Sequence, residues 1–373
     1  MPALLFGLGH RFGARWDNDQ KEIDVRVLVS GHTGYIGSKL VPMLLDAGHD
    51  VSGLDSDIFR DCTFVGELAD VPHNLKDVRD ATIDDVAGYD AIIHLAALSN
   101  DPLGDYDPGL TKTINEKASI RIAQLAKKAG VSRFLFASSC SNYGSAGEEF
   151  MTEDSRLDPI TPYGVSKVVV ERAVGPLADE SFCPVFLRAS TAYGASPRLR
   201  FDLVLNNLTA WAMTTGKVLL KSDGTPWRPV VHVEDICRAY LALLEAPAEI
   251  VRNRAYNIGT TTENYQIRDL AEAVASVVPN CEVTLADDAA PDKRCYRVDC
   301  NRIAKEVPGF KPQWTIARGV EELYATYKDV GLTLEDFEGQ RFQRIAHVKH
   351  LIATGRLTQS LRWAINTETE SAA

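Results

Sequence analysis

Apolar runs alternate with amphipathic segments through the first half of the chain. Residues 25–30 form a short apolar run that predicts a buried strand, and residues 35–47 place apolar side chains at helical spacing on one face. The segments at 110–129 and 163–179 also have the pattern of helices. Further strand-like runs cover residues 50–54, 91–95, 133–137 and 184–188. Such alternation is typical of a parallel sheet covered by helices on both faces, and it predicts an α/β fold.

The alternation weakens from about residue 190, where loops rich in proline and arginine begin. Helices are predicted at residues 201–215 and 233–244, and residues 255–259 have the pattern of a strand that returns to the large sheet. We therefore expect a second, smaller and discontinuous domain. The predicted division is an N-terminal extension at 1–24, a nucleotide-binding domain at 25–190 plus about 229–259, a substrate-binding domain at about 191–228 plus 260–330, and a C-terminal helical extension at 331–373. Apolar positions between residues 334 and 363 predict a helix in that extension, which either packs on the chain or mediates self-association.

The net charge and the lack of long apolar runs argue against several classes of protein. A net charge of −11 argues against general affinity for nucleic acid or an anionic membrane, although a local basic pocket can still hold an anion. No apolar run approaches the roughly 20 residues that span a bilayer, and residues 1–24 carry arginines instead of a secretory apolar core, so a cytoplasmic location is expected.

The seven cysteines are scattered and lack any Cys-x-x-Cys pair. We expect reduced thiols and no metal site.

A glycine turn sits between the first predicted strand and the first predicted helix. The pattern Gly31-x-x-Gly34-x-x-Gly37 permits a tight turn and lets a pyrophosphate approach the helix amides. Asp55 closes the second strand, where an acid accepts hydrogen bonds from both adenosine ribose hydroxyls and repels a 2′-phosphate, so NAD is favoured over NADP. Arg60 keeps NADP open, because an arginine in this loop can receive that phosphate. Asp77 is expected either to face the adenine or to be a plain loop acid.

Tyr163 and Lys167 stand four residues apart in a predicted helix, so they project from one face one turn apart. A nearby ammonium favours the phenolate and lowers the pKa of a tyrosine, which makes the pair a candidate for proton transfer. Pro162 suits the first turn of a helix, and Thr161 is the expected cap.

Five motifs in order resemble those of the extended short-chain dehydrogenase/reductase family, and within it the NAD-dependent nucleotide-sugar epimerases and dehydratases. They are Gly31-x-x-Gly34-x-x-Gly37, His94-Leu-Ala-Ala97, Asn115, Ser138-Ser-Cys-Ser-Asn-Tyr-Gly144 and Tyr163-x-x-x-Lys167. The resemblance covers roughly residues 25–330. It implies a Rossmann-type doubly wound parallel sheet with a smaller C-terminal substrate domain, tightly bound NAD, a nucleoside-diphosphate sugar as substrate, and a homodimer.

The resemblance also implies roles for individual residues. Tyr163 would exchange a proton with a sugar hydroxyl, Lys167 would hold the nicotinamide ribose and stabilise the tyrosinate, and Ser139 would bond the same sugar oxygen, with Ser138 as the neighbour most easily confused with it. Implied cofactor contacts are Gly31, Thr33, Gly34, Tyr35, Ile36, Gly37, Asp55, Asp77, Val78, Leu95, Ala96, Ala97, Asn115, Ser138, Tyr163 and Lys167. Implied substrate contacts are Ser99, Ser139, Cys140, Ser141, Asn207, Arg228 and Arg294. The alternative role for Asn207 is helix capping, and the alternative for Arg294 is an exposed side chain without a ligand. His232 is expected to be a buried structural histidine.

Departures from the family pattern narrow the chemistry. Relatives that remove water carry an Asp-Glu pair directly after the catalytic serine or threonine, where this chain has Cys140 and Ser141. Cys140 lies three residues before Tyr143, whereas the catalytic cysteine of double epimerases lies two before, so we disfavour an acid/base role for it. The chemistry that remains needs only Tyr163, Lys167, Ser139 and NAD: the nicotinamide takes a hydride from a secondary alcohol and returns it to the opposite face of the ketone, which is 4-epimerisation. The alternatives are an NAD(P)H-dependent reductase of nucleotide ketosugars, a dehydratase, and a non-catalytic binding protein of the same fold.

Overall fold

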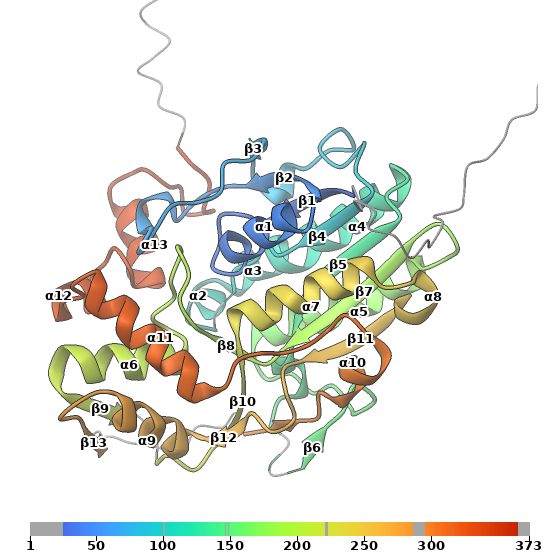
Figure 1. Cartoon of the computed structure of the whole chain (residues 1–373). Coiled ribbons are helices and arrows are strands. Elements are labelled where there is room, and N and C mark those ends of the chain that lie inside the picture. The colour runs from blue at the N-terminus through green and yellow to red at the C-terminus, as the bar shows by residue number, and fades with distance from the viewer. Residues whose placement is uncertain are drawn as a thin grey trace, which may run out of the picture.

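The computed structural model describes residues 25–99, 101–145, 147, 149–220, 223–285 and 295–364. Across these residues, seven parallel strands form one sheet in the order β3-β2-β1-β4-β5-β7-β11 (Figure 1). The predicted parallel α/β fold is confirmed, and the strand expected at 255–259 does return to the sheet, as β11 beside β7. The strands are β1 (Arg26–Ser30), β2 (Asp50–Asp55), β3 (His73–Leu75), β4 (Ala91–His94), β5 (Arg133–Ser139), β7 (Cys183–Ala189) and β11 (Arg254–Ile258).

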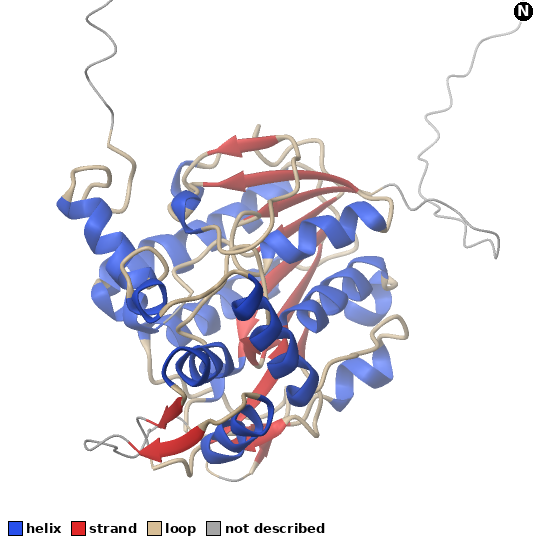
Figure 2. Cartoon of the chain, turned by 60° about the vertical axis from the view of Figure 1, so that its left-hand side comes forward, coloured by secondary structure: helices blue, strands red, loops and turns tan. Residues whose placement is uncertain are grey.

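Both faces of the sheet are buried under helices, which Figure 2 shows along the twisted strands. Successive side chains of β1 point to opposite faces of the sheet: Val27 and Val29 belong to one core, and Leu28 belongs to the other. Four helices contribute to the first core: α1 (Gly37–Asp46), α7 (Val233–Glu245), α8 (Ala248–Val251) and α10 (Asn301–Glu306). The second core contains the π-helical segment η3 (Lys112–Ala118), α4 (Ser119–Lys128) and α5 (Pro162–Val174). The short helices α2 (Asp101–Tyr106) and α3 (Pro108–Thr111) precede these three elements. In the part of the chain that the structure describes, no helix is long and apolar enough to cross a membrane.

The strand order reverses direction between β1 and β4. The chain runs outward from β1 through β2 to β3, then crosses back to β4 and continues through β5 and β7 to β11. Connections on the two sides of this point leave the sheet in opposite directions, which opens a crevice at the carboxyl ends of the strands. The fold therefore places a ligand-binding crevice beside the glycine turn that follows β1.

A smaller region lies beyond the carboxyl ends of the strands. It contains a three-stranded sheet and a two-stranded sheet, together with helices that bury an aromatic core (Figure 1). Its elements are β8 (Thr191–Tyr193), α6 (Val204–Thr215), β9 (Lys217–Leu220), β10 (Trp227–His232), β12 (Asn264–Gln266), α9 (Ile267–Val277), β13 (Glu282–Leu285) and α11 (Ile316–Asp329). The residue limits predicted for the two domains stay a prediction.

Helix α6 begins at Val204, not at residue 201 as the apolar pattern predicted. Two side-chain amides inside the helix turn back onto the preceding loop: Asn206 donates to the Arg200 carbonyl at 3.0 Å and Asn207 donates to the Phe201 carbonyl at 2.9 Å. These bonds stabilise an irregular approach to the helix, which leaves Phe201 fully buried in the aromatic core.

The C-terminal segment packs on the chain. The single helix expected there is divided into α12 (Leu334–Glu338) and α13 (Arg344–Ala353). Phe337 and Phe342 belong to the aromatic core of the smaller region, whereas Val348 and Leu361 belong to the core under the large sheet. The segment thus joins the two parts of the molecule, and of the two roles considered for it, packing is the one observed.

We expect Phe337→Ala to lower the free energy of unfolding by about 3–5 kcal/mol, because it empties a buried aromatic site. The ring of Phe337 is 1% exposed and contacts Phe201 and Trp211 edge to face, with centroids 5.2 and 5.4 Å away. Urea unfolding followed by circular dichroism measures the loss. Leu334→Ala is the matched control in the same helix, because Leu334 is 39% exposed and its loss should cost no more than about 0.5 kcal/mol. Equal effects of the two variants would show that α12 is not part of the core.

Candidate active site

A cavity of about 460 Å³ lies at the carboxyl ends of the central strands. Its wall runs from the glycine turn and the end of β2, past the ends of β4 and β5, to the start of α5 and the loops of the smaller region. Its size falls within the range of small-molecule and cofactor sites. Most of the predicted site residues line it, including the glycine turn, Asp55, residues 95–97, Tyr163 and Lys167.

The glycine turn can pack closely on its neighbours only because Gly31 and Gly37 carry no side chains. Gly31 has φ +79°, and a Cβ there would stand 2.7 Å from the backbone nitrogen of Ala96. A Cβ on Gly37 would stand 2.3 Å from the Gly31 carbonyl oxygen. The turn therefore packs directly on residues 95–97 after β4 and leaves backbone open to the cavity. Thr33, Gly34, Tyr35 and Ile36 complete this part of the lining.

Asp55 is fixed at the end of β2. One carboxylate oxygen accepts bonds from the Thr33 amide at 3.2 Å and its hydroxyl at 2.8 Å, and the other accepts from the Asp57 amide at 2.9 Å. Arg60, the residue that kept NADP open, does not line the cavity. Its guanidinium lies 3.9 Å from the centroid of the Trp363 ring.

Asp77 and Val78 line the same end of the cavity as Asp55. The Asp77 carboxylate is already paired with Arg79, at 2.9 Å from its Nε and 2.5 Å from its Nη2. It therefore holds the loop after β3 in place as well as bordering the cavity.

Asn115 does not line the cavity but fixes a segment that does. It is fully buried; its Oδ1 accepts from the Leu98 amide at 2.8 Å and its Nδ2 donates to the Leu98 carbonyl at 2.9 Å. Asn115 sits in the π-helical segment η3 and thereby anchors the turn through Leu95, Ala96 and Ala97. It acts on the cavity through this turn.

Helix α5 starts where the sequence predicted, with Pro162 in its first turn and the Thr161 hydroxyl accepting from the Gly164 amide at 3.2 Å. The start of this helix sets the direction in which Tyr163 and Lys167 project, and both line the cavity. The Lys167 ammonium lies 5.3 Å from the centroid of the Tyr163 ring and 4.8 Å from that of Phe136. Burial lowers the pKa of Lys167 to about 7, partly offset by Glu171 one turn further along.

The two neighbouring serines have different partners. Ser138 donates to Glu171 and accepts from the Asn142 amide at 3.1 Å, so its hydroxyl is engaged by two buried side chains. Ser139 bonds the Ser141 hydroxyl at 3.0 Å and accepts from the Ser141 amide at 3.1 Å. Ser138, Ser139 and Ser141 all line the cavity. This difference supports the choice of Ser139 over Ser138, and its chemical role stays a prediction.

A buried ion pair lies beneath these groups. Arg188, in β7, reaches Glu171 of α5 at 2.6 Å, and both side chains are less than a tenth exposed. The guanidinium also donates to the Tyr143 hydroxyl at 3.1 Å and to the Glu153 carbonyl at 3.0 Å. One cluster of hydrogen bonds thus joins α5, the ends of β5 and β7, and the turn that contains Tyr143.

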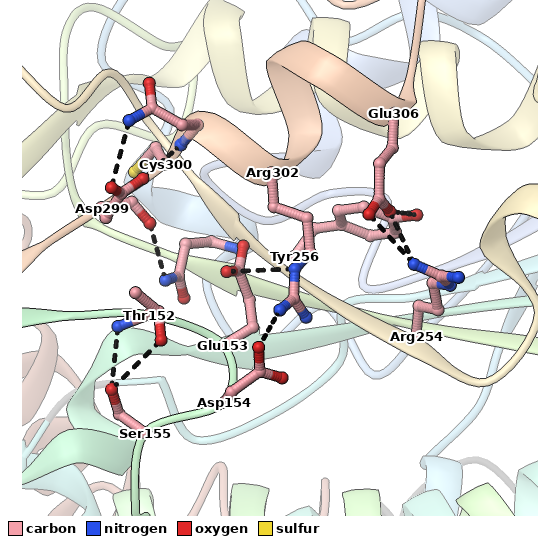
Figure 3. Close-up of polar contacts among 12 residues, drawn as sticks. Thr152, Glu153, Asp154, Ser155, Arg254, Tyr256, Asp299, Cys300, Arg302 and Glu306 are labelled. Atoms are coloured by element: carbon pink, nitrogen blue, oxygen red, sulfur yellow. Dashed lines mark hydrogen bonds and ion pairs between the residues drawn. The ribbon is translucent and has the colours of Figure 1, made fainter.

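The Glu153 side chain extends this network to β11, the edge strand beside β7. Figure 3 shows its carboxylate against β11, where it accepts from the Asn257 amide at 2.8 Å. Arg302 of α10 lies 3.5 Å from Glu153 and also contacts Asp154. Nearby, β6 (Phe150–Met151) pairs with β14 (Arg297–Val298). Residues 150–154 are therefore held beside the ends of β7 and β11.

Cys140 is a correction to the sequence prediction, because it does not reach the cavity. Strand β5 ends at Ser139, and the tight turn Cys140–Tyr143 directs the thiol into a small apolar cluster with Val298 and Cys300. Cys140 is fully buried, and burial raises the pKa of its thiol to about 12. The doubt about Cys140 as an acid/base is therefore supported, whereas its place among the substrate contacts is wrong.

Other predicted substrate contacts have different outcomes. Asn207 does not line the cavity and its side chain bonds the approach to α6, so its contact with substrate stays a prediction. Arg228 and Ser99 do line the cavity, whereas Arg294 falls outside the described residues.

His232 is the buried structural histidine that the sequence predicted. Its Nε2 lies 2.8 Å from the Glu322 carboxylate, and its ring stacks on Trp314 at 3.8 Å. Among the described residues, no group of acids, histidines and cysteines could hold a metal ion.

Sequence reasoning missed two arginines that line the cavity, Arg200 and Arg344. Arg200 pairs with Asp202 at 2.5 Å and donates to the Ser99 hydroxyl at 3.2 Å. The concentration of arginines around residue 200 was a usable signal. Arg344 belongs to the C-terminal segment, where the sequence has no motif, and only the folded structure brings it to the cavity.

Comparisons with known proteins agree on a family. A family model described as the NAD dependent epimerase/dehydratase family matches residues 27–259. A UDP-glucose 4-epimerase from Mycolicibacterium smegmatis is 28% identical over 321 residues, which cover 82% of this chain and 99% of that protein. Part of this chain therefore has no counterpart in that relative.

Two solved structures resemble the chain over most of their length. MoeE5 in complex with UDP-glucuronic acid and NAD has a TM-score of 0.70 at 26% identity, covering 82% of this chain and 99% of that one. The dTDP-glucose 4,6-dehydratase DesIV from Streptomyces venezuelae, with NAD and TYD bound, has a TM-score of 0.70 at 25% identity, covering 82% of this chain and 97% of that one.

Arg188→Met should lower the free energy of unfolding by about 3–5 kcal/mol, because it leaves the Glu171 carboxylate buried without its partner. Adding Glu171→Leu to that variant should restore much of the loss, since it removes the carboxylate that the first substitution left without its partner. Chemical denaturation measures both. Arg26→Met is the matched control, because Arg26 and Asp90 form an exposed pair and its loss should cost less than about 1 kcal/mol. A double variant no more stable than Arg188→Met would contradict this account.

Lys167 should make the stability of the ligand-free protein depend on pH. Its folded pKa of about 7 lies below the unfolded value near ~10.4, so between these values the unfolded chain binds a proton that the folded chain does not. Stability must then rise with pH across this window. Relative to Lys167→Met, the wild type should gain about 2 kcal/mol in free energy of unfolding from about pH 7 to about pH 9, measured with nucleotide removed. A difference that stays constant with pH would show that Lys167 keeps its ordinary pKa.

Proposed function

The chain belongs to the NAD-dependent epimerase/dehydratase family, and from this premise we propose that it is an NAD-dependent epimerase acting on a nucleoside-diphosphate sugar. The proposed reaction inverts the configuration at C4 through a transient 4-keto sugar. The observation that carries it is Tyr163 beside the buried ammonium of Lys167, in one cavity with the glycine turn and Asp55.

The residues at the nucleotide end fit NAD. The glycine turn packs closely because Gly31 and Gly37 carry no side chains, and its backbone lines the cavity. Asp55 lines the cavity where the ribose hydroxyls of adenosine would lie. An acid at this position disfavours a 2′-phosphate, and Arg60 is occupied by its contact with Trp363. NAD is therefore the cofactor of the proposed reaction.

The chain's own residues would move the proton and hold the sugar. Bound NAD would supply the hydride chemistry, which is removal from C4 and return to the same carbon. Tyr163 accepts the proton of the C4 hydroxyl as the ketone forms and later returns it, while Lys167 favours the phenolate. Ser139 donates a hydrogen bond to the same oxygen.

Inversion requires the ketone to present its other face, so the site must bind the diphosphate and leave the sugar free to turn. Arg228 is suited to that binding, because a guanidinium binds phosphate oxygens in pairs.

A uridine diphosphate sugar is the substrate we propose. The relative from Mycolicibacterium smegmatis is named a UDP-glucose 4-epimerase, and MoeE5 was solved with UDP-glucuronic acid. A homodimer is part of the proposal and is measurable by light scattering.

Dehydration is the second candidate function, favoured by the likeness to the Streptomyces venezuelae enzyme. The residues after Ser139 disfavour it, because Cys140 is buried with a raised pKa and Ser141 is no acid. Nothing at these two positions offers the additional acid and base that removal of water needs.

The purified protein with NAD should interconvert UDP-glucose and UDP-galactose, or the corresponding uronates, without net formation of NADH. Proton NMR of the anomeric signals measures conversion, and absorbance measures NADH. Tyr163→Phe should lower kcat about 10²–10⁴-fold while NAD binding is kept, because only the proton exchanger is removed. Tyr106→Phe is the matched control, since it removes a partly exposed hydroxyl outside the cavity.

Each other outcome identifies an alternative. Stoichiometric use of NADH with a ketosugar would indicate a reductase, and a deoxy-ketosugar product would indicate a dehydratase. No conversion of any uridine, guanosine, cytidine or thymidine diphosphate sugar would rule the epimerase out.

A further inference from the structure

The C-terminal segment, residues 334–364, closes over the loop that follows β2. The Trp363 indole donates to the Ser56 carbonyl at 2.6 Å, and Arg341 donates to the Asp61 carbonyl at 2.8 Å. Figure 1 shows α13 beside this loop, far in sequence from it. The loop starts directly after Asp55, so the segment borders the nucleotide end of the cavity, where Leu361 joins the lining.

Arg344 projects from the start of α13 into this wall. Its side chain is 7% exposed and lines the cavity. The guanidinium lies 3.9 Å from the centroid of the Phe59 ring and donates to the Arg198 carbonyl at 2.9 Å. Within the described residues, no carboxylate lies within ion-pair distance of it.

The neighbouring charges do not neutralise Arg344. Arg198 and Arg200 are the nearest other cations, and each already has a carboxylate, Asp57 at 3.3 Å and Asp202 at 2.5 Å. Three neighbouring arginines thus have two aspartates between them, and two of these arginines, Arg200 and Arg344, line the cavity. Burial lowers the pKa of Arg344 to about 10, which leaves it charged at neutral pH. A buried cation with one backbone acceptor is costly unless an anion completes its surroundings.

We infer that Arg344 binds the pyrophosphate of the dinucleotide, an inference that rests on the proposed use of NAD. Arg344 shares its wall with Ile58 and Phe59, just beyond the ribose acid Asp55. Arg200 lies on its other side and bonds Ser99, in the turn that leads toward Tyr163. Arg344 therefore stands between the adenosine end and the reacting end, where the two phosphates of a dinucleotide lie.

This arrangement gives the C-terminal segment a binding role. The glycine turn offers backbone amides on one side of the cavity, and Arg344 offers a charged, two-pronged donor on the other. Arg228 is left for the diphosphate of the substrate. The segment that completes the fold thus also completes the cofactor site.

Isothermal titration of NAD, ADP and adenosine into the nucleotide-free protein tests this inference. Arg344→Gln should weaken NAD and ADP about 10- to 100-fold and leave adenosine unchanged, because only the first two carry a diphosphate. Arg344→Lys should recover part of the loss, since it keeps the charge. Arg341→Gln is the matched control; Arg341 is exposed, belongs to the same segment and does not line the cavity.

Thermal unfolding of the nucleotide-free variants gives a second readout. Removing an unpaired buried charge should leave the Tm of Arg344→Gln unchanged or raised, whereas a purely structural arginine would lower it. Equal weakening of adenosine, or unchanged binding of NAD and ADP, would overturn the inference. If the wild type binds ADP through Arg344 but does not bind NAD, the proposed function fails while the anion site stands.

Discussion

The buried ion pair between Arg188 and Glu171 is the constraint on which the site depends. Glu171 lies two turns beyond Tyr163 on the same face of α5, so whatever fixes Glu171 also fixes the direction of Tyr163 and Lys167. Arg188 fixes it from β7 and at the same time holds the turn after β5 through Tyr143. Because neither charge can be left alone in a dry interior, the pair permits one arrangement of helix and strands.

The same pair explains why two adjacent serines have different environments. Glu171 accepts a hydrogen bond from the Ser138 hydroxyl, whereas the Ser139 hydroxyl at the strand end bonds to Ser141; both serines line the cavity. Strand alternation then ends, because residues 140–143 form a tight turn and Cys140 moves into an apolar cluster. One set of hydrogen bonds therefore decides which side chains of the motif are available to a ligand.

Local patterns in the sequence predicted most of the fold and the centre of the site. Strand and helix periods depend on neighbouring residues, and Tyr163 and Lys167 share a face by spacing alone. Predictions failed where distant residues decide the outcome. The approach to α6 depends on Asn206 and Asn207 reaching back, and the C-terminal helix divides because Phe337 and Val348 belong to two different cores. Arg344 has no local signal, since α13 meets the β2 loop only in the folded chain.

Three buried cations near the cavity differ in whether the protein itself supplies a carboxylate partner. Arg188 has its carboxylate within the protein and is neutralised before any ligand arrives. In the described structure, Lys167 and Arg344 have no carboxylate at ion-pair distance, and burial lowers the pKa of each. Their desolvation destabilises the empty protein, and an anionic ligand in the cavity would offset it. The acidic chain thus keeps uncompensated positive charge where we propose that a dinucleotide diphosphate and a tyrosinate lie, and this charge lowers the stability of the ligand-free state.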